Sequence, residues 1–428
     1  MQYYPIPPRA ETKLLAVGEN ALASIPEVLK KYFPDRKPWL VADENTFAAA
    51  GKTVLEGLEK SGFSPCPPVI FPATPVLHAE SAHADRLAEE MPQDAVPVAV
   101  GSGTVNDLVK RASGIRGVSY CCVPTACSVD GYTSRGAALS CDGFKQTMPC
   151  PAPLAVVADT RVLASAPKPM FSSGYADLAA KIVAGGDWII ADELKIETID
   201  REIWDLVQSR LRDQLSDCSR LDKIFQGLAA TGFAMQIYRE SRPASGADHL
   251  FSHIWEMENL QKDGQVVSHG FKVAIGTLAS TLLMEFIIDT PVETARKLAK
   301  PGISRAEREA EVNDLLKRGC YGDGAYKVAM EKFLEGAKLA ERREAIFSVW
   351  ERLQTRLRSQ LIGFDELRKM FRTAGCPISP AEINLDKEQF LHGFRAAQLI
   401  RKRYTVLDLL YEAGLFDVAE QRLADCRW

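Results

Sequence analysis

Hydrophobic positions in the first third of the chain form short runs separated by helical patterns. The runs that are bounded by Pro, Gly or Asp predict buried strands at residues 39–42, 69–71, 96–100, 119–123 and 154–157. Stretches between them, such as residues 20–32 and 106–112, have the periodicity of helices. Strands that alternate with helices are typical of an α/β domain with a mostly parallel sheet, in which ligands bind beyond the carboxyl ends of the strands.

The pattern changes near residue 168, after which strand-like runs disappear. Long helical patterns follow at residues 175–194, 249–260, 271–288, 325–361 and 392–414. Residues 304–311 are heavily charged and indicate a solvated helix face. The sequence therefore predicts an α/β nucleotide-binding domain over residues 1–165 and an all-α domain over residues 166–428.

Composition narrows the classes of partner. The chain has 428 residues, of which 46% are hydrophobic, and its net charge is −4. This balance excludes a nucleic-acid groove and favours a small-molecule substrate. The most apolar stretch, residues 270–288, contains Lys272 and Glu285, so we expect a buried helix and no membrane span. Ten cysteines without a pair of CxxC motifs, and no signal-peptide pattern, predict free thiols in a cytoplasmic protein.

A glycine-rich turn over residues 101–107 follows the predicted strand at residues 96–100. Gly101 and Gly103 let the backbone approach a ligand, and the amides of the next helix can stabilise a pyrophosphate. A tight turn with a Ser or Thr cap explains the same pattern equally well. Asp43, at the end of an earlier strand, can accept hydrogen bonds from a ribose diol or cap the following helix.

Three of the six histidines lie in one short stretch of the helical region. His249 and His253 are four residues apart and share one helix face, while His269 precedes the apolar helix. Two histidines from separate helices and a carboxylate can hold a divalent ion, and Asp177 is the best carboxylate. Asp177 can equally be a helix-start acid or a partner of Lys181. His249 and His253 can equally be ordinary buried or surface histidines.

Seven stretches in order resemble the iron-containing alcohol dehydrogenase superfamily, in particular its sn-glycerol-1-phosphate dehydrogenase branch. They are VADENT at 41–46, GSGTVND at 101–107, PTACSVDGYTS at 124–134, GYADLAAK at 174–181 with DW at 187–188, HLFSH at 249–253, SHGFKVAIG at 268–276 and IRKRYTVLDLL at 400–410. The resemblance covers nearly the whole chain. It implies a Rossmann-like domain followed by a helical metal- and substrate-binding domain, which is the dehydroquinate synthase-like fold.

By this resemblance the first domain binds NAD(H) or NADP(H). The implied coenzyme contacts are Asp43, Gly101, Ser102, Gly103, Thr104, Asp107, Thr125 and Ser128. Asp43 faces the adenosine ribose and favours NAD over NADP. The 101–103 loop holds the pyrophosphate.

The resemblance also assigns the second half of the site. Asp177, His249 and His269 fall on the metal-ligand positions, Asp130 on a position that binds substrate hydroxyls, and His253 faces the substrate together with Asp177. We expect Asp130 and His253 to act in catalysis, with His253 or a water that it holds returning a proton. Iron-using relatives usually have a second His one turn after the ligand Asp, where this chain has Lys181. The expected ion is therefore Zn or Ni in preference to Fe.

The implied reaction is the reversible reduction of dihydroxyacetone phosphate to sn-glycerol 1-phosphate by NAD(P)H. The cations that can meet the phosphate are Arg135, Lys145, Lys181 and Lys272. Alternatives are a glycerol or other polyol dehydrogenase without phosphate recognition, and a metal- and NAD-dependent lyase like dehydroquinate synthase. The helical domain offers surface for a homodimer.

Overall fold

The computed structural model describes residues 2–141, 144–319 and 321–428. The chain divides into two compact units: the first comprises Met1–Leu178 and Arg212–Glu240, and the second comprises Ala179–Leu211 and Ser241–Trp428. These units are groups of residues that contact one another, and they do not correspond to a division between strands and helices. The expected division into an α/β and a helical domain after residue 165 therefore stays a prediction.

The first unit contains a seven-stranded sheet in the order β1-β2-β9-β6-β5-β3-β4. The bounds of its strands are Gln2–Tyr3 (β1), Leu14–Gly18 (β2), Lys37–Asp43 (β3), Val69–Phe71 (β4), Ala95–Gly101 (β5), Cys121–Pro124 (β6) and Ala155–Asp159 (β9). All neighbouring pairs are parallel except β1 with β2. A separate antiparallel hairpin joins Ala137–Cys141 (β7) to Phe144–Met148 (β8). The mostly parallel α/β sheet confirms the predicted fold class.

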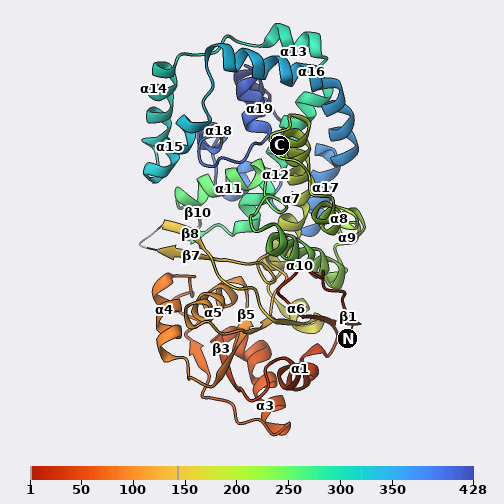
Figure 1. Cartoon of the computed structure of the whole chain (residues 1–428), viewed down its shortest axis with the longest axis vertical. Coiled ribbons are helices and arrows are strands. Elements are labelled where there is room, and N and C mark those ends of the chain that lie inside the picture. The colour runs from red at the N-terminus through yellow and green to blue at the C-terminus, as the bar shows by residue number, and fades with distance from the viewer. Residues whose placement is uncertain (1, 142–143, 320) are drawn as a thin grey trace. The chain divides into compact units, whose positions relative to one another are not determined.

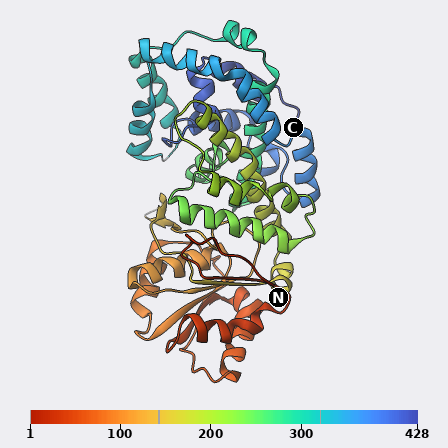
Figure 2. The same cartoon turned by 45° about the vertical axis from the view of Figure 1, so that its right-hand side comes forward.

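Helices flank this sheet on both faces, as Figure 2 shows in red and orange. The helical segments of the unit are Ala21–Ser24 (η1), Ile25–Tyr32 (α1), Glu44–Thr46 (α2), Phe47–Gly51 (η2), Lys52–Lys60 (α3), Ser81–Glu90 (α4), Gly103–Arg116 (α5), Thr160–Ser165 (α6) and Leu221–Tyr238 (α10). One core packs η1, α1 and α3 against alternate residues of the strands. Every residue of β5 is buried, as expected of a central parallel strand.

The second unit is helical (Figure 1, green to blue). Its helices are Arg201–Gln208 (α8), Ala247–Met257 (α11), His269–Asp289 (α12), Val292–Leu298 (α13), Arg305–Leu316 (α14), Gly322–Lys332 (α15), Gly336–Gln360 (α16), Phe364–Ala374 (α17), Pro380–Ile383 (η3), Lys387–Ala397 (α18), Val406–Glu412 (α19) and Phe416–Ala424 (α20). The unit boundary divides two further helices, Lys168–Glu193 (α7) and Leu211–Leu215 (α9). The late part of the chain is thus helical, as predicted.

Several sequence expectations need correction in detail. The pattern over residues 325–361 is two helices, α15 and α16, and the pattern over 392–414 is also two, α18 and α19. The hydrophobic period runs on across both breaks because apolar residues occupy the turns, such as the buried Leu399 and Ile400. Strands also occur after residue 168, where none was expected. Gln261–Lys262 (β10) and Gln265–Val266 (β11) form a hairpin whose Asp263-Gly264 turn has two positive φ values, typical of type I′.

Helix α12 is long and apolar enough to cross a membrane by length and composition. However, 83% of its most apolar window is buried inside the structure. It lies against α11, α16, α17 and α20 of its own unit. This is the burial expected of a core helix that is apolar on all sides.

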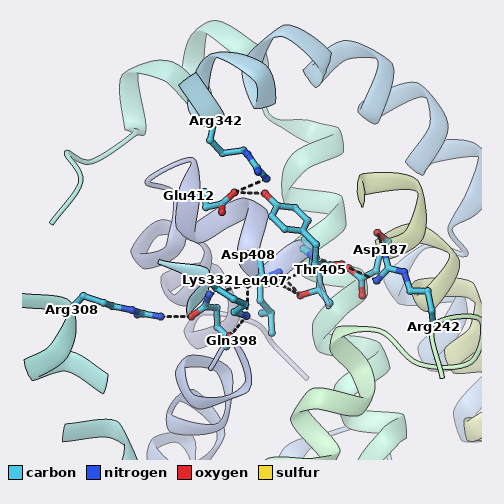
Figure 3. Close-up of polar contacts among 12 residues, drawn as sticks. Asp187, Arg242, Arg308, Lys332, Arg342, Gln398, Thr405, Leu407, Asp408 and Glu412 are labelled. Atoms are coloured by element: carbon cyan, nitrogen blue, oxygen red, sulfur yellow. Dashed lines mark hydrogen bonds and ion pairs between the residues drawn. The ribbon is translucent and has the colours of Figure 1, made fainter. Parts of the chain in front are cut away.

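Polar side chains tie the carboxyl-terminal helices together (Figure 3). Asp187 on α7 accepts hydrogen bonds from the backbone N–H groups of Ala247 and Val406, both at 2.6 Å. Thr405 and Asp408 form a capping box at the start of α19, and the Nζ of Lys332 lies 2.7 Å from an oxygen of Asp408. These buried groups satisfy one another inside the unit, so they hold helix ends in place.

Candidate active site

The three predicted metal ligands, Asp177, His249 and His269, are brought together. Each offers one ligand atom, and these atoms all lie within 4.8 Å of one another. His249 is on α11 and His269 is the first residue of α12. Asp177 is on α7, one residue before the unit boundary, and that helix continues into the second unit. Among the described residues, this is the group of His, Cys, Asp and Glu whose geometry suits a metal ion.

Close packing of α11 on α12 positions the two imidazoles. Gly276 on α12 lies against the backbone of Asp248, and a Cβ at Gly276 would come within 2.2 Å of the Asp248 carbonyl oxygen. Only glycine allows this approach. Ser268 caps α12 by accepting a hydrogen bond from the N–H of Phe271, so His269 starts the helix. The ring centroids of His249 and His269 are consequently 5.3 Å apart.

Carboxylates orient both imidazoles. The Nδ1 of His249 is hydrogen-bonded to Asp248, and the Nδ1 of His269 lies 2.7 Å from the Oε1 of Glu256. A histidine that gives its Nδ1–H to a carboxylate presents the Nε2 lone pair, as metal-binding histidines do. The donor set, one carboxylate and two oriented imidazoles, fits a divalent ion such as Zn²⁺. The sequence prediction missed Asp248 and Glu256, although an acid next to a ligand histidine was a visible signal.

The loop that carries Asp130 is bound to Asp177. The backbone N–H of Asp130 donates a hydrogen bond of 3.0 Å to the Oδ2 of Asp177. Gly174, one turn earlier on α7, makes room for this loop, because a Cβ there would come within 2.0 Å of the Cys127 carbonyl oxygen. The structure therefore brings Asp130 to the ligand carboxylate. Its role toward a substrate hydroxyl stays a prediction.

His253 lies one turn after His249 on α11, and its side chain is 31% exposed. Its ring centroid is 6.5 Å from that of His269, and its Nδ1 lies 3.4 Å from the Oε2 of Glu256. Removal of the ring from bulk water lowers the pKa of His253 to about 4, although Glu256 opposes this shift. His253 is thus a neutral imidazole at pH 7.

The predicted coenzyme residues gather at the carboxyl edge of the sheet. Gly101 ends β5 beside Pro124 at the end of β6, and the N–H of Thr125 donates to the Gly101 carbonyl at 3.0 Å. Ser102 is the N-cap of α5, but its side chain makes no capping hydrogen bond. The amides of the first turn, which includes Gly103 and Thr104, are therefore not engaged by a cap and fit a pyrophosphate.

Three other predicted coenzyme residues already have protein partners. Asp43 caps α2, because its Oδ1 accepts a hydrogen bond of 2.8 Å from the N–H of Thr46. The oxygens of Asp107 meet the Nζ of Lys110 at 3.2 Å and the N–H of Ala138 at 3.1 Å. The hydroxyl of the buried Ser128 lies 3.1 Å from that of Tyr132. Asp43 therefore caps a helix, as the sequence allowed. The coenzyme roles of all three residues stay predictions.

The predicted phosphate cations differ in their surroundings. The Nε of Arg135 lies 3.1 Å from Glu11, so that guanidinium is engaged. Lys181 and Lys272 are both buried, and Lys272 lies 3.6 Å from Glu256. The side chain of Lys145 lies outside those that the structure describes. Lys181 and Lys272, on the helices that carry Asp177 and His269, remain the better candidates.

Known proteins resemble this chain over most of its length. Residues 16–167 match the iron-containing alcohol dehydrogenase family. The glycerol-1-phosphate dehydrogenase (NAD(P)+) of Bacillus licheniformis is 29% identical over 420 residues, which cover 94% of this chain and 89% of that protein. The enzyme of the same name from Halalkalibacterium halodurans is 32% identical over 307 residues, which cover 69% and 77%.

The fold is also found among solved structures. A probable glycerol dehydrogenase from Sinorhizobium meliloti has a TM-score of 0.58 at 15% identity. The match covers 95% of this chain and 97% of the other. At that identity the likeness concerns the fold alone, and it agrees with an α/β sheet followed by helices.

Proposed function

Because the chain belongs to the glycerol-1-phosphate dehydrogenase branch of the iron-containing alcohol dehydrogenase superfamily, we propose that it reduces dihydroxyacetone phosphate to sn-glycerol 1-phosphate. It is an NAD(P)-dependent alcohol dehydrogenase, and the reaction is reversible. The observation that carries the proposal is the grouping of Asp177, His249 and His269 within 4.8 Å, in a chain similar to enzymes of that name.

Asp177, His249 and His269 would hold one divalent ion. Lys181, buried one turn after Asp177, stands where iron-using relatives usually have another histidine. A site of one carboxylate and two imidazoles with open positions suits Zn²⁺ and other divalent first-row ions, and it is the lysine in place of that histidine that leads us to propose Zn or Ni in preference to Fe. When bound, the ion polarises the ketone oxygen as a Lewis acid, and the reduced nicotinamide supplies the hydride to carbon.

The protein's own side chains position the ketone and move the proton. The Asp130 loop, held by Asp177, would orient the substrate hydroxyl. His253 is neutral at pH 7, so it would accept a proton during alcohol oxidation. In the reducing direction it would pass on a proton from solvent, to which 31% of its side chain is exposed.

The coenzyme would lie along the carboxyl edge of the sheet. The uncapped first turn of α5 would receive the pyrophosphate, and Thr125 would line the adjoining wall. Asp43 keeps its Oδ1 on Thr46, and its carboxylate charge disfavours a 2′-phosphate. We therefore propose NADH as the preferred coenzyme. A cytoplasmic location and a homodimer complete the proposal; the burial of α12 supports a core helix in place of a membrane span.

A substrate comparison tests the proposal. Purified protein loaded with Zn²⁺ or Ni²⁺ is assayed with NADH and NADPH against dihydroxyacetone phosphate and dihydroxyacetone. We expect the phosphorylated ketone to give the higher kcat/KM, and NADH to be oxidised stoichiometrically. Equal rates with the two ketones would indicate a polyol dehydrogenase without phosphate recognition. Product formation without net NADH oxidation would indicate a lyase.

A further inference from the structure

Glu256, which the sequence analysis did not single out, contacts three side chains in and beside the candidate site. Its side chain is 7% exposed and lies three residues after His253 on α11. The Oε1 lies 2.7 Å from the Nδ1 of His269 and 3.6 Å from the Nζ of Lys272, both on α12. The Oε2 lies 3.4 Å from the Nδ1 of His253. One buried carboxylate thus meets two imidazoles and an ammonium.

We propose that Glu256 is a positioning residue that sets the ring orientation and the tautomer of both His269 and His253. An ionised carboxylate only accepts hydrogen bonds, so each Nδ1 that faces it carries the proton. The Nε2 of each ring is then the lone-pair nitrogen, turned away from Glu256. For His269 that nitrogen is the metal ligand, and for His253 it is the atom that exchanges a proton with the substrate. This inference rests on the proposed function.

Lys272 belongs to the same arrangement. Its side chain is 3% exposed, and a buried carboxylate is costly unless a cation or hydrogen-bond donors compensate it. The Lys272 ammonium, 3.6 Å from the Oε1 of Glu256, therefore compensates the charge of this carboxylate between the two rings. Asp248 orients His249 from the other side of the site, but its carboxylate meets only that ring and the N–H of Gly246 among the contacts of the described residues. Glu256 couples the metal ligand to the proton-transfer residue, whereas Asp248 serves the metal ligand alone.

A matched control exists on the same helix end. Glu258 follows α11 directly, and its carboxylate contacts Tyr321 and the Nε2 of His392, which is 3.2 Å away. This is also a carboxylate–histidine pair in the helical unit, but His392 is not a predicted ligand. Glu258→Gln therefore reproduces the loss of a carboxylate from a histidine without touching the site.

The first measurement is Zn²⁺ affinity of the metal-free protein, by competition with a chromophoric chelator. In Glu256→Gln the amide oxygen can accept from one imidazole only, and the amide N–H faces the other, so one ring must change its tautomer. We expect Zn²⁺ to bind about 10- to 100-fold more weakly, while Glu258→Gln binds within about twofold of the wild type. Glu256→Asp keeps the charge with a shorter side chain and should recover part of the affinity.

The second measurement separates positioning from folding. Selective ¹⁵N labelling of histidine reports which ring nitrogen is protonated in the metal-free protein. We expect Nδ1–H for His253 and His269 in the wild type, and a change at one or both rings in Glu256→Gln but not in Glu258→Gln. Should Glu256→Gln fail to fold, the spectra of Glu256→Asp decide the question. Wild-type Zn²⁺ affinity in a folded Glu256→Gln, or wild-type tautomers in the labelled variant, would overturn the inference. A wild-type protein that binds Zn²⁺ but does not reduce the ketone phosphate would instead contradict the proposed function.

Discussion

Helix α7 carries two buried aspartates with opposite surroundings. Asp177 is 1% exposed and Asp187 is fully buried. Both oxygens of Asp187, which is labelled in Figure 3, accept hydrogen bonds from backbone N–H groups, those of Ala247 and Val406. Asp177 accepts a hydrogen bond from the backbone N–H of Asp130 and offers an oxygen within 4.8 Å of two imidazole ligand atoms.

The difference shows how a helix separates a structural carboxylate from a functional one. Hydrogen bonds from the backbone offset part of the cost of burying the Asp187 carboxyl group and fix the chain at the start of α11 and of α19. A divalent cation held together with His249 and His269 would compensate the charge of Asp177. We therefore expect substitution of Asp187 to affect folding and substitution of Asp177 to affect metal binding and turnover.

The largest expected effect is that of Asp177→Asn on catalysis. An amide replaces an anionic ligand, so the site loses both charge and affinity for the ion. We expect kcat/KM for ketone reduction to fall by about 10²–10³-fold. Steady-state kinetics with saturating metal measure this change. The apoprotein should melt within a few degrees of the wild type, and a large loss of Tm would make Asp177 a structural residue like Asp187.

Asp187→Asn should have the next largest effect, and on stability. The amide oxygen can accept a hydrogen bond from one of the two backbone N–H groups. The amide nitrogen faces the other N–H, and because both are donors that hydrogen bond is lost. We expect the free energy of unfolding to fall by about 2–4 kcal/mol. Urea denaturation followed by circular dichroism measures it. Asp177→Asn is the matched control, since it makes the same change on the same helix. Equal stabilities of the two variants would remove the proposed distinction.

The increase in Tm on adding metal should distinguish Asp177→Asn from Asp187→Asn, with a smaller effect than the two above. An ion that binds only the folded protein stabilises it by about 2.7 kcal/mol when its concentration is 100 times Kd. Adding Zn²⁺ or Ni²⁺ should therefore raise the Tm of the wild type and of Asp187→Asn, but not that of Asp177→Asn. A chelator should reverse the increase. An equal increase in all three proteins would place the ion elsewhere.

The smallest expected effect is on pH dependence. Burial raises the pKa of Asp187 from 3.8 to about 7, although the two backbone N–H groups and Arg242 oppose the shift. The protonated form is thus favoured in the folded state, and this contribution is fully present below about pH 4 and is lost as the pH rises through 7. Wild-type stability relative to Asp187→Asn should fall by up to about 1.4 kcal/mol per pH unit in this window. Urea midpoints at pH 5, 6 and 7 measure it, and a constant difference would contradict the raised pKa.

The local pattern of hydrophobic and polar residues predicted those strands that are apolar runs and those helices that have a regular hydrophobic period. The strands β3, β5, β6 and β9 were visible because parallel strands buried on both faces are continuous apolar runs. The edge strand β4 was also visible as an apolar run, although Ile70 is exposed. The breaks between α15 and α16 and between α18 and α19 were not, because apolar side chains in the turns continue the helical period. These side chains are half-buried at Phe333 and Leu334 and buried at Leu399 and Ile400. The short β10–β11 hairpin is too polar to have been detected as strands, with all four residues exposed.

The sequence predicted the three side chains that gather at the candidate site, but not the carboxylates that orient two of them. Histidine spacing and family motifs selected Asp177, His249 and His269. The roles of Asp248 and Glu256 depend on which way each ring turns when α11 packs on α12 at Gly276, and no sequence period encodes that contact. For Asp43 the sequence allowed two roles, a ribose contact or a helix cap. The hydrogen bond to Thr46 shows that it caps the helix.

Metal stoichiometry most directly tests the central claim that Asp177, His249 and His269 form the metal centre of a ketone phosphate reductase. The wild type, Asp177→Asn and Asp187→Asn are stripped with a chelator, loaded with Zn²⁺ or Ni²⁺, desalted and analysed for bound metal. The account predicts one ion per chain in the wild type and in folded Asp187→Asn, and none in folded Asp177→Asn. One tightly bound ion per chain in Asp177→Asn, or none in a wild type that still oxidises NADH, would contradict it.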